Sequence, residues 1–86
     1  MNAAKRPKED WTLTLEKLHR FIVRRNESEL QTNLQFGIDL YAEGIKLEDL
    51  GKPRRVGQDH NRNGVFEWVT PFGRLIEERG KLRLET

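Results

Sequence analysis

The sequence predicts an α+β domain made of two amphipathic helices, a β-hairpin and a third short helix. Apolar residues recur at intervals of three and four over residues 11–22 and again over 30–45, the spacing of a helix with one buried face. Residues 54–69 contain short β-branched and aromatic stretches around a polar turn, which is typical of a hairpin. With 86 residues, the chain is long enough for one domain with a single small core.

Charge is unevenly distributed along the chain. Residues 1–25 carry seven Lys and Arg against three acids, residues 26–51 one against six, and residues 52–86 eight against five. The first nine residues also lack periodic apolar positions. We therefore expect a disordered basic arm over residues 1–9, followed by a single domain over residues 10–86.

Helix signals follow the arm. Asp10 is a suitable N-cap for the first helix, because its carboxylate can accept free amide protons of the first turn. Ser28 and Gln31 have the spacing of a capping box that would start the second helix, and Gly44 would end it. Gly37 interrupts the second apolar stripe and predicts close approach of another backbone. The predicted stripes are Trp11, Leu15, Leu18 and Ile22 in the first helix, and Leu30, Leu34, Gly37, Ile38, Tyr41 and Ile45 in the second.

The second half of the chain predicts a helical turn over residues 47–50, strands over 54–58 and 65–69, and a third helix. Thr70 is a suitable cap for that helix, with Pro71 at its first position. Its end would lie at Gly80, and residues 81–84 would form a short strand or trail along the body. The residues expected to be buried are Trp11, Leu15, Leu18, Ile22, Leu34, Ile38, Phe66 or Trp68, Phe72 and Ile76.

The segment from Val65 to Gly80 contains Thr70, Pro71, Gly73, Arg74 and Leu75 in a pattern that resembles the end of winged-helix transcription regulators of the MarR, PadR and HxlR type. In those families the second wing strand runs into a helix with a similar start. The resemblance covers residues 54–80 and implies a winged-helix-like architecture that binds DNA in transcription regulation.

The helix before the hairpin carries four acids and no basic residue before Lys46. Acids repel the phosphate backbone, so the first helix and the hairpin are the expected nucleic-acid contacts. The sequence does not distinguish DNA from RNA. The candidate binding residues are Lys17, Arg20, Arg24, Arg54, Arg55 and Arg62.

The alternative function is a non-catalytic protein–protein interaction module or homo-oligomerisation domain that uses the second helix. An acidic segment between two basic ones suits pairing between copies or with a partner, because complementary potentials steer association. The surface separates the two hypotheses: a continuous basic face favours nucleic acid, and an exposed apolar face of the second helix favours a protein partner.

Other function classes have little support in the sequence. The chain has no cysteine, and His19 and His60 lack the spacing of a zinc site. Asp59, Asn61 and Asn63 match the first half of a calcium loop, but Thr70 occupies the twelfth position, where an acid is required. We therefore expect no catalytic residues, metal, cofactor or small-molecule substrate. No apolar run is long enough to cross a membrane, and we expect a cytoplasmic protein.

Overall fold

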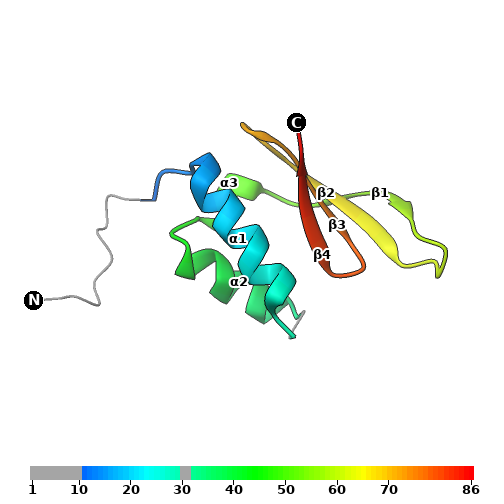
Figure 1. Ribbon diagram of the computed structural model, residues 1–86. Helices are drawn as coiled ribbons and strands as arrows, with labels where there is room; N and C mark the ends of the chain where they lie inside the picture. Colours follow the sequence, from blue (N-terminus) through cyan, green and yellow to red (C-terminus); the bar gives the residue numbers. More distant parts are fainter. Residues whose placement is uncertain (1–10, 30–31) are drawn as a thin grey trace, which may run out of the picture.

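The computed structural model describes residues 11–29 and 32–86, which form helices packed beside a four-stranded antiparallel sheet (Figure 1). The strands follow one another in the order β1-β2-β3-β4, so neighbours in the sequence are neighbours in the sheet. This mixed architecture confirms the α+β class. The helices are α1 (Leu15–Glu27), α2 (Asn33–Ala42) and α3 (Leu47–Leu50), and the strands are β1 (Arg54–Gln58), β2 (Gly64–Thr70), β3 (Gly73–Glu78) and β4 (Lys81–Glu85).

Threonine side chains cap the two longer helices. The Thr14 hydroxyl accepts the amide of Lys17 at 3.1 Å, and the Thr32 hydroxyl accepts the amide of Gln35 at 3.1 Å. Each bond satisfies an amide of the first turn that lacks a partner within the helix. The predicted caps differ. Asp10 lies outside the described residues, and Ser28 ends α1 instead of starting α2, with its amide bonded to the Arg25 carbonyl.

The predicted third helix after Thr70 is wrong, because this segment is a tight turn followed by strand β3. The Thr70 hydroxyl donates to the Gly73 carbonyl at 2.8 Å and accepts the Phe72 amide at 3.0 Å, which closes the turn. Gly73 has φ of 132°, a conformation that a helix cannot contain. A Cβ at Gly73 would also lie 2.5 Å from the Glu85 carbonyl oxygen, so only glycine fits. The expected helical turn over residues 47–50 and the first hairpin are confirmed.

The core lies between the helices and one face of the sheet. Phe36 of α2 meets Phe21 edge-on, with ring centroids 5.3 Å apart, and stacks on Trp68 at 5.4 Å. Helix α1 packs against β4 and α2, and α3 packs against β2. The buried residues of this core are Leu18, Phe21, Leu40, Ile45, Leu50, Trp68, Leu75 and Leu82.

The burial predictions are confirmed only in part. Leu18, Trp68 and Ile76 are buried, but Ile76 lies outside the core cluster, on the sheet face opposite Leu75. Trp11, Ile22, Phe66 and Phe72 are half-buried. Leu15, Leu34 and Ile38 are exposed, so those three predictions are wrong.

Helix α1 also closes one edge of the sheet. The Asn26 side chain donates to the Leu82 carbonyl at 3.0 Å and accepts the Leu82 amide at 2.7 Å. In this way Asn26 makes the two bonds that a neighbouring strand would make to β4. The opposite edge strand, β1, is exposed along its whole length. Its turn into β2 projects away from the helices (Figure 1).

Candidate functional site

Of the six predicted nucleic-acid residues, Lys17 has an internal role. Its side chain is buried in α1, and its ammonium group donates to the carbonyls of Thr12 at 2.8 Å and Gly44 at 3.1 Å. These bonds join the start of α1 to the loop after α2. An ammonium group held this way cannot also reach a phosphate on the surface.

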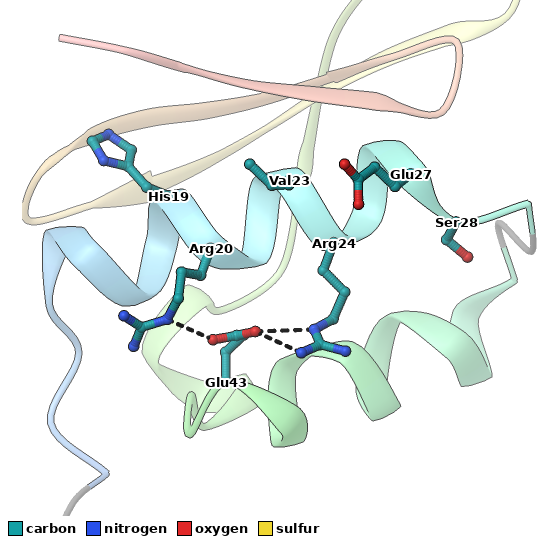
Figure 2. Close-up of a pocket in the computed structure, with 7 residues that line it drawn as sticks. All are labelled: His19, Arg20, Val23, Arg24, Glu27, Ser28 and Glu43. Atoms are coloured by element: carbon teal, nitrogen blue, oxygen red, sulfur yellow. Dashed lines mark hydrogen bonds and ion pairs between the residues drawn. The ribbon is translucent and has the colours of Figure 1, made fainter.

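Arg20 and Arg24 point from α1 at one carboxylate, that of Glu43 at the end of α2 (Figure 2). Arg20 Nε lies 3.0 Å from Glu43 Oε1, and Arg24 donates to Oε2 through Nε at 3.0 Å and Nη2 at 2.9 Å. Burial alone would raise the pKa of Glu43, but the hydrogen bonds from the two arginines outweigh it, and the pKa is lowered. The two cations therefore hold α2 against α1. The groove around them is also lined by His19, Val23, Glu27 and Ser28.

The lowered pKa of Glu43 predicts an acid-dependent loss of stability. A carboxylate whose pKa falls on folding stabilises the fold above its unfolded pKa, and this contribution disappears as the pH falls through the folded pKa. We expect Glu43→Gln to be less stable than the wild type near neutral pH, and the difference to shrink as the pH falls below the ordinary glutamate pKa of about 4.3 and through the lower pKa of the folded protein. Urea denaturation over a pH series measures it. Glu27→Gln, in the same groove, is the matched control, and an equal deficit for Glu43→Gln at every pH would contradict the prediction.

The other three candidate arginines lie on or beside β1. Arg54 pairs with the buried carboxylate of Glu67 at 2.8 Å. Arg55 donates to the Gln58 side chain at 3.2 Å, and Arg62 is exposed in the turn. Within residues 11–29 and 32–86, Arg55 and Arg62 are the two of the six that make neither an ion pair nor a buried contact.

The structure does not bring the six residues together on one basic face. Arg54, Arg55 and Arg62 belong to the β1 edge of the sheet, whereas α1 packs against β4 at the other edge. Glu43 and Glu67 form ion pairs with three of the five surface arginines in the set. These six residues therefore do not form the single continuous basic face that would favour nucleic acid.

The outer side of α2 is apolar, in contrast to the charged positions of the arginines. Leu34 is 77 % exposed, Ile38 51 % and Tyr41 61 %, and exposed Gly37 lies among them. Positions spaced by three, four and seven residues share one side of a helix, so these four residues form a continuous apolar strip, here called the α2 face. From the sequence, Leu34 and Ile38 of this stripe were expected to be buried, and the face of the second helix was the interaction surface of the alternative function. The opposite side of α2 packs into the core instead, through Phe36 and Leu40.

No charged side chain interrupts the α2 face. Helix α2 contains one charged residue, Asp39, which is 3 % exposed and pairs with buried Arg25 at 3.1 Å. A Cβ at Gly37 would meet no atom within 4 Å, so the backbone there is open to contact. A groove of about 560 Å³ adjoins Gly37, and its lining includes Phe36, exposed Leu47, Pro53 and Trp68.

The residues that match half of a calcium loop, Asp59, Asn61 and Asn63, stabilise the turn after β1. Asp59 Oδ1 accepts the amides of Asn61 at 2.8 Å and Asn63 at 3.0 Å, and Oδ2 pairs with Arg79 at 3.3 Å. The amide of Asn63, followed by that of Asn61, holds the pKa of Asp59 below its usual value. The carboxylate is thus occupied by the turn itself. Among the residues described, no group of three or more His, Asp or Glu side chains is arranged to hold a metal ion.

No protein-family model, curated protein or solved structure matches this chain. The resemblance of residues 54–80 to winged-helix regulators therefore stays a prediction. In the described residues, no helix is both long and apolar enough to span a membrane.

Proposed function

We propose that this protein is a non-catalytic interaction module that docks a protein surface through the α2 face. The observation that carries the proposal is the exposure of Leu34, Ile38 and Tyr41 on one side of a single helix. Scattered exposed apolar residues are ordinary on protein surfaces, but a contiguous apolar strip marks an interaction site.

The energetics favour covering this strip. Moving an exposed leucine or isoleucine side chain out of water stabilises a complex by about 1.5–3 kcal/mol before the costs of association are subtracted. Tyr41 adds a large ring, and its contact with Trp11, at a centroid distance of 5.5 Å, holds that ring in place. A side chain ordered in advance loses less entropy on binding. An amphipathic helix laid against an apolar groove is a common recognition mode.

The nucleic-acid hypothesis has weaker support. It retains Arg55 and Arg62, which are exposed and unneutralised, but the other four residues of its proposed site are engaged internally. Two phosphate contacts give a small affinity with a shallow salt dependence, because the slope scales with the number of contacts. We therefore treat nucleic-acid binding as an alternative outcome of the test below.

The test places a photo-reactive amino acid at position 38, or at Val69 as a control, in the cells that make the protein. Val69 is 70 % exposed and lies on strand β2, far along the chain from α2. We expect a discrete protein adduct from position 38, absent from position 69 and abolished by Leu34→Glu but not by the matched Val69→Glu. Equal labelling from both positions would overturn the proposal.

A second arm measures binding of the purified protein to mixed-sequence DNA and RNA at about 50 mM salt. Salt-dependent binding that is lost in Arg55→Ala/Arg62→Ala and kept in Leu34→Glu, without the position-38 adduct, would replace the proposal with the nucleic-acid function. Absence of such binding, together with the adduct, supports the protein-docking function.

A further inference from the structure

We infer that the surface covering the α2 face is the α2 face of a second copy of this chain, packed antiparallel across a two-fold axis between Gly37 and Ile38. The inference rests on the proposed function and identifies the partner. A two-fold axis at this point pairs residues whose numbers sum to 75. Leu34 then lies opposite Tyr41 of the second copy, and Gly37 opposite Ile38.

Side-chain sizes suit this register. Gly37 leaves a gap, since a Cβ there would meet no atom within 4 Å. Ile38 of the second copy is the branched side chain that the symmetry brings to that gap. The same pair occurs twice, once on each side of the axis, so the contact is self-complementary, as a two-fold interface requires. Leucine and tyrosine fill the two outer positions.

The charges also suit a second copy. A two-fold contact brings the same patch of both molecules together, so a charged patch would repel itself. The α2 face has no charge, because Asp39 is buried with Arg25 and Glu43 is held by Arg20 and Arg24. The α2 faces of two copies therefore carry no charges that would repel each other.

The charged residues on either side of α2 favour antiparallel over parallel packing of the two copies. Glu29 precedes the helix and Lys46 follows it; both are exposed and neither makes an ion pair with the residues described. Antiparallel packing brings Glu29 of one copy towards Lys46 of the other, whereas parallel packing would place like charges together. Antiparallel packing also sets the positive end of one helix dipole beside the negative end of the other.

The size of the surface implies a weak dimer. Stable interfaces bury about 800 Å² on each partner and involve some 20–30 residues. The α2 face offers four residues, extended on one side by exposed Leu47 at the adjoining groove. We therefore expect association that depends on protein concentration.

Disulfide trapping tests both partner and direction, because the natural chain contains no cysteine. Leu34→Cys and Tyr41→Cys, one carrying a mass tag, are mixed and oxidised gently. We expect the mixed disulfide to form faster than either symmetric one. Seven residues separate positions 34 and 41, so two copies of the same position lie about 10 Å apart along antiparallel helices, beyond the roughly 7 Å Cα separation a disulfide tolerates.

Four outcomes would overturn the inference. Predominant symmetric disulfides would indicate parallel packing. Cross-linking no faster than that of Val69→Cys would indicate random collision. If sedimentation shows a monomer at high concentration while the position-38 adduct has the mass of another protein, this inference fails and the proposed function stands. If neither adduct nor dimer forms, both fail.

Gly37→Ala provides an independent test with opposite effects on monomer and dimer. The added methyl group meets open space in the monomer, and alanine favours a helix, so the monomer should unfold at the same temperature or higher. In the dimer the methyl group occupies the gap that receives Ile38, so the dissociation constant should rise by about tenfold. An unchanged dissociation constant would remove Gly37 from the contact and contradict the register.

Discussion

Replacing Asp39 by alanine should lower the free energy of unfolding by about 3–5 kcal/mol, because it leaves the Arg25 guanidinium buried without its carboxylate. Arg25 is 1 % exposed and lies over the Phe36 ring at 5.0 Å, so water cannot take the place of Asp39. Gln35 also donates to Asp39 Oδ1 at 2.9 Å and would lose that bond. Urea denaturation at neutral pH measures the loss.

The double variant Arg25→Leu/Asp39→Leu is the control. Apolar residues that replace a buried ion pair often leave stability unchanged or raise it, since neither charge then has to be desolvated. We expect the double variant to recover most of the stability lost in Asp39→Ala. A loss below about 1 kcal/mol for Asp39→Ala would mean that Arg25 finds other compensation on removal of the carboxylate.

Phe21→Ala should also destabilise the fold by about 3–5 kcal/mol. The Phe21 side chain is fully buried and meets the Phe36 ring edge-on, and Phe36 in turn stacks on Trp68. Removing the ring leaves a cavity where α1, α2 and the sheet meet. Val23→Ala, on the same helix but 54 % exposed, should change stability by no more than about 0.5 kcal/mol. Similar losses from both variants would contradict the placement of the core.

Sequence patterns predicted most of the elements correctly, but the helix expected after Thr70 is a turn followed by β3. The spacing of three and four located α1 and α2, and the alternation over residues 81–84 favoured the strand that β4 forms. Thr70 and Pro71 are as suitable for a tight turn as for a helix start. The choice depends on Gly73, whose backbone lies against the carbonyl of Glu85, twelve residues later. No local pattern contains that contact.

The candidate site was harder to predict for a similar reason. Helix α2 has apolar residues on two sides, Leu34 and Ile38 on one and Phe36 and Leu40 on the other, and periodicity does not specify which side packs inward. The basic candidates were chosen from their positions in the chain, but their ion pairs depend on distant partners. Glu43, which binds Arg24, lies nineteen residues after it in the chain.

The contact between Asn26 and Leu82 limits how the sheet can grow. A strand from another molecule cannot align along β4 without displacing the Asn26 side chain, whereas β1 presents an exposed edge. Strand addition can therefore occur at one edge only. Two molecules joined by their β1 edges have no edge left for a third, so the product is a closed pair. Fibre formation through the sheet would require α1 to detach first.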